Sequence, residues 1–159
     1  MGLSLVGTIH TFFGIIGVVA ALYMLLRNRE IDPKTPAGLI YFVTITASCL
    51  LVFALPHMRA AGFNPGHVLT LLTLGSLFLG FFARSLKIRG WPYIQALGLS
   101  ASLFFSLVPT INETLTRLPV GAPLATSPQD PLVLTSLGVL TVLFLSFCLA
   151  QILKSRKAA

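Results

Sequence analysis

The sequence predicts an all-α fold, a five-helix transmembrane bundle with its N-terminus outside and its C-terminus in the cytoplasm. Two observations predict this fold: five long apolar runs, and basic residues concentrated in every second connection between them. The composition agrees, because 55% of the residues are hydrophobic and only 9% are charged, with a mean hydropathy of +0.91. A soluble domain carries about 25% charged residues. We therefore expect one integral membrane domain, residues 1–159, whose main partner is the lipid bilayer.

The basic residues set the predicted orientation, because Lys and Arg near helix ends are retained in the cytoplasm. Arg59 and Arg117 fall on the predicted outer side. The other nine of the eleven basic residues lie on the predicted inner side: Arg27, Arg29, Lys34, Arg84, Lys87, Arg89, Lys154, Arg156 and Lys157. Because these residues flank apolar spans, the net charge of +7 reflects topology, and nucleic-acid binding is not expected.

Each predicted span has the length and the boundaries of a transmembrane helix. The first has no basic residue before it and so does not resemble a secretory signal. Prolines follow it in the first inner connection, and Asn64-Pro65-Gly66 precedes the third span. Trp91 opens the fourth span at interfacial depth, and a basic segment follows the fifth. The five spans are residues 3–26, 37–55, 67–86, 91–111 and 131–153, with inner connections 27–36 and 87–90 and outer connections 56–66 and 112–130.

Four ligand-competent side chains, in or next to the outer ends of four spans, share the predicted outer side: His10, His57, His67 and Glu113. Ionisable groups at membrane depth are costly and tend to face the bundle interior or water. Imidazole and carboxylate groups are plausible ligands of zinc or copper. The sequence therefore indicates an outer site for a transition metal or for haem, with His10 as the leading ligand. It does not identify the cofactor.

The first span also admits a structural interpretation. Gly14 and Gly17 lie on the same helix face as His10, where they leave room for a close neighbour. That neighbour is a flat cofactor in one interpretation, and in the other it is a second helix, from this chain, from another subunit or from a second copy. Similarly, His57 and His67 suit the membrane interface, and Glu113 suits an ion pair with Arg117 one turn later.

A stripe of polar residues follows one face of the fourth span at helical spacing. It includes Gln95, Ser102 and Ser106 and leads to Glu113. One interpretation is a seam where helices pack and form hydrogen bonds. The other is a polar path through the bundle, as a small transporter or channel requires.

The two cysteines, Cys49 and Cys148, are predicted at different depths in the membrane, too far apart for a disulfide. No phosphate-binding glycine loop and no Ser-His-Asp order is present, so a hydrolase is not supported.

The stretch 112–119, NETLTRLP, together with Gly121 and residues 122–124, resembles a loop of small bacterial multi-pass membrane proteins of unknown function. The segments 10–14, HTFFG, and 63–67, FNPGH, are compatible with that group. The resemblance implies a location in the bacterial inner membrane and supplies no activity. Histidines on a small helical bundle are also similar to membrane b-type cytochromes, although a full set of paired axial histidines is absent here.

Three classes of function follow from these features. The favoured class is a redox-related or metal-linked membrane protein that uses the outer His/Glu site. The second is a small transporter or channel with a polar path along the fourth span. The third is a non-catalytic accessory subunit of a larger membrane complex.

Overall fold

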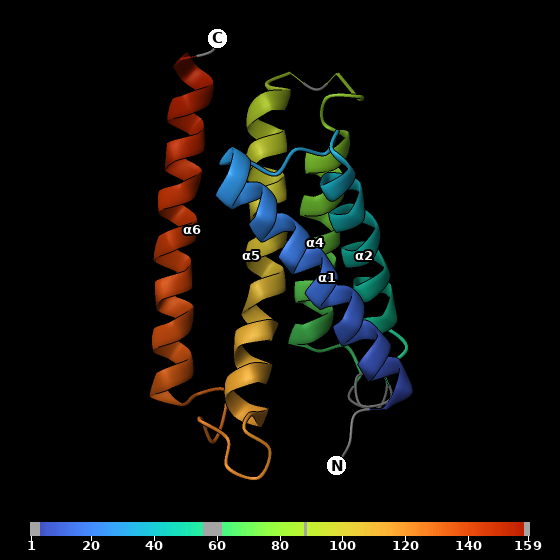
Figure 1. The fold of residues 1–159 in the computed structure, drawn as a ribbon, viewed down its shortest axis with the longest axis vertical. Coiled ribbons are helices and arrows are strands. Elements are labelled where there is room, and N and C mark those ends of the chain that lie inside the picture. Colours follow the sequence, from blue (N-terminus) through green and yellow to red (C-terminus); the bar gives the residue numbers. More distant parts are fainter. Residues whose placement is uncertain (1–3, 56–61, 88, 158–159) are drawn as a thin grey trace.

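The computed structural model describes residues 4–55, 62–87 and 89–157, and in this part of the chain the fold is all-helical. Within these ranges the bundle is built from five helices, which confirms the predicted fold class (Figure 1). They are α1 (Leu5–Asn28), α2 (Pro36–Val52), α4 (Pro65–Phe82), α5 (Trp91–Arg117) and α6 (Pro131–Lys157).

The first three helices begin at side-chain caps. Ser4 accepts a hydrogen bond from the N–H of Gly7, and Thr35 accepts one from that of Gly38. The side chain of Asn64 caps α4 in the same way. These caps satisfy backbone donors that have no partner inside the helix. The polar residue before each of these three apolar runs therefore marks a helix start.

The cap of α6 is an ionised carboxylate in the loop before the helix. Asp130 accepts hydrogen bonds from the backbone N–H groups of Leu132 and Thr126, at 3.0 and 3.1 Å. These bonds favour the charged form and lower the pKa of Asp130. The cap is therefore fully formed above the ordinary carboxyl pKa and is lost as the pH falls through the lowered value.

The main correction to the predicted boundaries concerns the second outer connection. The sequence predicts a loop over residues 112–117, but α5 continues to Arg117 and passes through Pro109 without ending. A proline removes one intrahelical donor, and the residues after it propagate the helix. The ion pair of Glu113 with Arg117, four residues apart, stabilises this last turn. Hydropathy marked the end of the apolar span, which is not the end of the helix.

Smaller differences occur at the other helix ends. α1 continues past the predicted end of its span to Asn28, whereas α2 stops at Val52 and α4 at Phe82, before the predicted ends of their spans. Four helices, α1, α4, α5 and α6, are long and apolar enough to cross a membrane, and α2 is an apolar helix of 17 residues. At a rise of about 1.5 Å per residue, α2 reaches the lower limit of a spanning helix. The start of α1 and the end of α6 lie at opposite ends of the bundle, as the five predicted crossings require (Figure 1).

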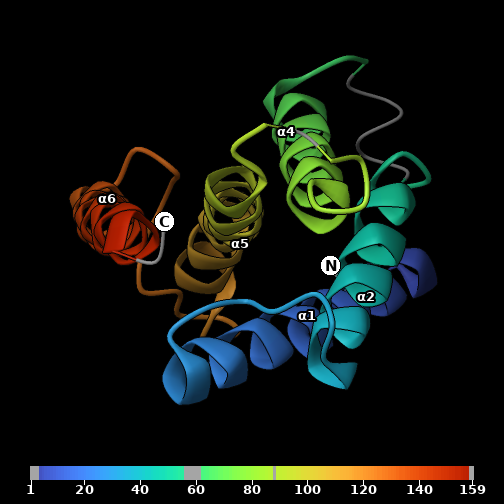
Figure 2. The ribbon, with the colours of Figure 1, turned by 90° about the horizontal axis from the view of Figure 1, so that it is seen from above.

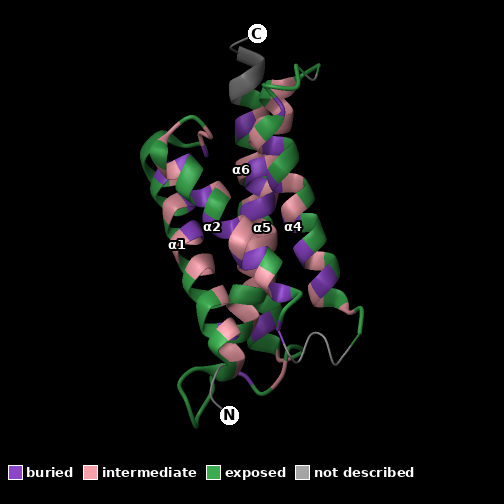
Figure 3. Ribbon diagram, turned by 90° about the vertical axis from the view of Figure 1, so that its right-hand side faces the viewer, coloured by how far each residue is buried: buried purple, intermediate pink, exposed green. Residues whose placement is uncertain are grey.

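The helices associate as two pairs and an outer member. α1 packs most extensively on α2, and α4 packs on α5, while α6 lies against α5 at one side of the bundle (Figure 2). Buried residues follow the inward sides of the helices, and exposed apolar residues cover the outer faces (Figure 3). Cys49 and Cys148 are both free, which confirms the prediction of two separate thiols.

Each pair is held together at glycines. A Cβ on Gly17 of α1 would lie 2.6 Å from Ile45 Cδ1 of α2. A Cβ on Gly80 of α4 would lie 2.7 Å from the backbone nitrogen of Leu99 in α5, and Gly98 faces Gly80 at similar range. Without side chains at these positions the helix backbones approach closely, as in other membrane helix pairs.

Candidate functional site

His10 on α1 binds α2 through a reciprocal pair of contacts. Its Nδ1 lies 2.8 Å from the carbonyl oxygen of Ser48 and 3.0 Å from the Ser48 Oγ. The Ser48 hydroxyl in turn donates to the His10 carbonyl oxygen at 3.0 Å. Because a carbonyl only accepts, Nδ1 carries the hydrogen, and in the neutral ring the lone pair is on Nε2. His10 is thus a structural link between two helices, with its second nitrogen in the form that a metal requires.

The glycine face below His10 is covered by α2. The Cβ positions of Gly14 and Gly17 point at Ser48 and at Ile45 and Thr44, and Gly17 is buried. The close neighbour expected at this face is therefore a helix of the same chain.

His67 belongs to the start of α4. It is 7% exposed, and its Nδ1 accepts the backbone N–H of Asn64 at 3.3 Å, which completes a capping box. The ring lies beside Phe53 and Phe63, with centroid separations of 5.4 and 5.7 Å. Its Nδ1 lone pair is thus committed to the helix cap.

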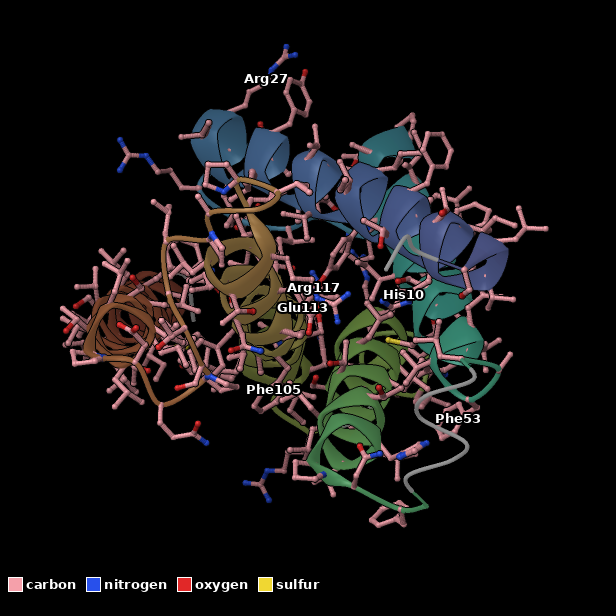
Figure 4. All side chains as sticks on the ribbon, turned by 90° about the horizontal axis from the view of Figure 1, so that it is seen from below. His10, Arg27, Phe53, Phe105, Glu113 and Arg117 are labelled. Carbon is pink, nitrogen blue, oxygen red and sulfur yellow. The ribbon has the colours of Figure 1, made fainter. Side chains whose placement is uncertain are left out.

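Glu113 pairs with Arg117 on the last turn of α5, and both side chains are about half exposed. Figure 4 views the bundle from this end and shows His10 on α1 and the Glu113–Arg117 pair on α5. His57 lies outside the described residues. Within the described ranges, no group of three or more His, Cys, Asp or Glu residues is arranged to hold a metal ion. The predicted outer haem or metal site therefore gains no support from a convergence of ligands.

The polar stripe of α5 is partly in the bundle centre. Ser102 is completely buried, and its Oγ lies 2.7 Å from the hydroxyl of Tyr41 on α2. Ser102 donates its own hydrogen to the Leu99 carbonyl, so Tyr41 donates to Ser102. Ser106 donates back to the Ser102 carbonyl. The Tyr41–Ser102 bond joins the two helix pairs through the middle of the bundle.

Gln95 lies at the predicted inner end of the stripe, where it lines a cavity of about 300 Å³. Side chains from the first inner connection, from the segment that follows α4 and from α5 and α6 surround this cavity. Its walls carry charges of both signs and two amides, and we call it the inner cavity. It is lined by Glu30, Ile31, Asp32, Lys34, Arg84, Trp91, Pro92, Gln95, Ala96 and Gln151.

Gln151 of α6 is one of the residues of this cavity that the sequence does not mark as a site residue. It is 6% exposed, and its Nε2 lies 3.3 Å from the Ser100 Oγ. Ser100 already donates its hydrogen to the Ala96 carbonyl at 2.7 Å, so it accepts from the amide nitrogen. The amide oxygen of Gln151 is buried without a hydrogen-bond partner among the described residues. A lone amide near the inner end of an otherwise apolar span was the signal available in the sequence.

Arg84 and Trp91 form the other notable contact at the cavity. The guanidinium carbon of Arg84 lies 5.1 Å from the centroid of the Trp91 ring. This is a cation–π arrangement, which holds the guanidinium by its face.

A second hollow of about 510 Å³ lies at the predicted outer end of α4. Its wall is mostly apolar and contains no charged side chain: Phe63, Asn64, Pro65, Val68, Leu69 and Leu72. It offers little to orient a polar ligand.

No protein-family model, no curated protein and no solved structure matches this chain. The fold and composition define a class: a helical bundle whose helices are apolar enough to indicate a membrane protein.

Proposed function

We propose that the protein is a small carrier of the bacterial inner membrane, which binds a charged polar solute at its cytoplasmic end. The observation that carries this proposal is the inner cavity, where acidic, basic and amide side chains from several elements line one space. Solute sites contain a few convergent polar groups in an otherwise apolar wall. The distribution of basic residues supports the cytoplasmic assignment of this end.

The face of α5 supplies the path of this carrier. Gln95 and Ser102 are seven residues apart, which places them on one side of the helix. Gln95 lines the inner cavity, and the buried Tyr41–Ser102 bond joins α2 to α5 about two turns further on. The arrangement fits a carrier that is open to the cytoplasm and closed at its centre.

Uptake into proteoliposomes tests the carrier. The probes are three radiolabelled zwitterions: glycine, glycine betaine and phosphoethanolamine. We expect faster uptake of at least one probe than in protein-free liposomes. The Gln95→Leu variant should take up this probe at least tenfold more slowly, because it lacks the amide that connects the inner cavity to the polar stripe of α5.

Thr110→Val is the matched control for this experiment, because Thr110 is an exposed polar residue of the same helix. Its uptake should equal that of the wild type. If the protein is folded and helical but takes up none of the three probes faster than protein-free liposomes do, the carrier proposal is overturned.

A second candidate function has one observation in its favour. The hydrogen bond from His10 Nδ1 to Ser48 leaves Nε2 with its lone pair, the form in which histidine binds haem iron or zinc. Absorption spectra of purified protein, oxidised and reduced, combined with elemental analysis, test this candidate. A Soret band or stoichiometric metal would support it, and a colourless, metal-free protein prepared with haem and metals in the medium would overturn it.

A further inference from the structure

His67 occupies a position in the cap of α4 that is usually taken by a residue of another type. In a capping box the third residue of the helix reaches back to the N–H of the cap residue, and it is ordinarily Glu or Gln. Here the third residue is His67, whose Nδ1 accepts the N–H of Asn64 at 3.3 Å. Histidine titrates between about pH 5 and 8. One bond of this cap therefore depends on the protonation state of the ring.

The atom that makes the cap bond is also the atom that takes up a proton. Because Nδ1 accepts, the neutral ring of His67 carries its hydrogen on Nε2, and neither nitrogen keeps a lone pair for a metal. A further proton must bind to Nδ1. The imidazolium donates from both nitrogens, so it no longer accepts from Asn64. Two N–H groups then face each other where the neutral ring forms a hydrogen bond.

His10 differs from His67 in this respect. Its Nδ1 donates to the Ser48 carbonyl oxygen, so the lone pair of the neutral ring is on Nε2. A proton binds at Nε2 and leaves the bond to Ser48 in place. Acid is therefore expected to act on the start of α4 and to spare the link of His10 between α1 and α2.

The surroundings of His67 determine how the cap responds to the charge. The start of a helix carries a partial positive charge, and the first turn of α4 contains no acidic residue that would compensate an imidazolium. The described rings beside His67 are those of Phe53 and Phe63, which do not titrate. Aromatic faces attract a cation, so the charged ring can stay beside them while the cap opens. His57 and Arg59 lie outside the described residues and enter the experiment as variants.

We propose that His67 is a pH-sensitive cap, which holds the first turn of α4 when its ring is neutral and releases it when the ring binds a proton. The cap is complete at the upper end of the range in which histidine titrates, and it is lost as the pH falls. Phe63, Asn64 and Pro65 also belong to the wall of the hollow of about 510 Å³ at this end of α4, so the change alters that wall. The inference does not depend on the carrier function, because His67 is not part of the inner cavity.

Nitrogen NMR of protein with ¹⁵N-labelled histidine, in detergent micelles, tests the assignment of the hydrogens. At about pH 8 we expect the hydrogen of His67 on Nε2 and that of His10 on Nδ1, so the two rings give different pairs of nitrogen signals. The His67→Gln variant identifies the signals of His67, because they are missing from its spectrum. At about pH 5 both ring nitrogens of His67 should be protonated.

Hydrogen exchange of the Asn64 amide reports on the cap itself, because this N–H is the donor. The measured quantity is the protection factor, the exchange rate of an unfolded chain divided by that of the protein at the same pH. We expect the protection factor to fall about fivefold between about pH 8 and about pH 5, as the loss of a cap of typical strength implies. The amide of Asn112, inside α5, is the reference and should keep its protection.

His67→Gln is the matched variant, because glutamine fills the same position in ordinary capping boxes and does not titrate. The Asn64 amide of this variant should have the wild-type protection factor at about pH 8 and should keep it at about pH 5. His57→Gln and Arg59→Gln are the controls for the rest of the first outer connection. Both should retain the pH dependence of the wild type.

Three results would overturn the inference. The first is a hydrogen on Nδ1 of His67 at about pH 8. The second is the same protection factor for Asn64 at both pH values. The third is a pH dependence that persists in His67→Gln or disappears in either control variant, because a group other than His67 would then control the cap.

Discussion

Replacing Gly80 with alanine is expected to lower the free energy of unfolding by about 3 kcal/mol, the upper end of the usual cost of overpacking. The added Cβ would lie 2.7 Å from the backbone nitrogen of Leu99 and 3.0 Å from the Gly98 carbonyl carbon. Backbone atoms in the middle of a helix cannot rotate away, so α4 and α5 must separate. The measurement is the midpoint of unfolding when SDS is added to the protein in mild detergent micelles.

Gly75→Ala is the matched control, because it is on the same helix and a Cβ there would have no neighbour within 4 Å. Alanine is the better helix former by up to about 1 kcal/mol, so this variant should equal or exceed the wild type in stability. Equal midpoints for the two variants would contradict the close contact between α4 and α5.

Replacing His10 with alanine is expected to destabilise the protein by about 1–3 kcal/mol. The variant loses the bond from Nδ1 to the Ser48 carbonyl and leaves a gap between α1 and α2. The same unfolding measurement applies, and crosslinking between cysteines placed on the two helices reports whether the pair separates.

Thr11→Ala controls for the loss of a polar side chain on α1. Thr11 is exposed, and its hydroxyl donates to the Gly7 carbonyl of its own helix. Its free energy of unfolding should stay within about 0.5 kcal/mol of the wild-type value, the range typical of surface substitutions. If His10→Ala were equally mild, the link from His10 to Ser48 would not contribute to stability.

The class of fold could be predicted from the sequence because a membrane imposes simple requirements on length and polarity. The caps at Ser4, Thr35 and Asn64 mark three helix starts, and in the sequence each of these polar residues comes just before an apolar run. The end of α5 could not be predicted in this way. Its last turn, with Glu113 and Arg117, is polar and helical, whereas hydropathy reports only where the apolar span ends.

The candidate sites depended on which helices meet, and a single sequence does not contain that information. His10 was correctly assigned to a face with room for a neighbour, but its partner Ser48 is 38 residues away on another helix. His10 and His67 are predicted on the same side of the membrane, but His10 contacts α2, whereas His67 belongs to the cap of α4. Gln151 contacts the inner cavity because α6 packs on α5, which periodicity in α6 does not reveal.

The pairing of the helices has a consequence for how the protein is made. α1 and α2 leave the ribosome one after the other, and so do α4 and α5, so each main interface joins neighbours in the chain. Short loops make such pairing fast, because closing a short loop loses little conformational entropy. The first hairpin can enter the bilayer complete, and the second can follow as a unit. The bond between Tyr41 and Ser102, 61 residues apart, then forms when the two hairpins dock. Biogenesis can therefore proceed by insertion of one hairpin after another, and α6 joins last.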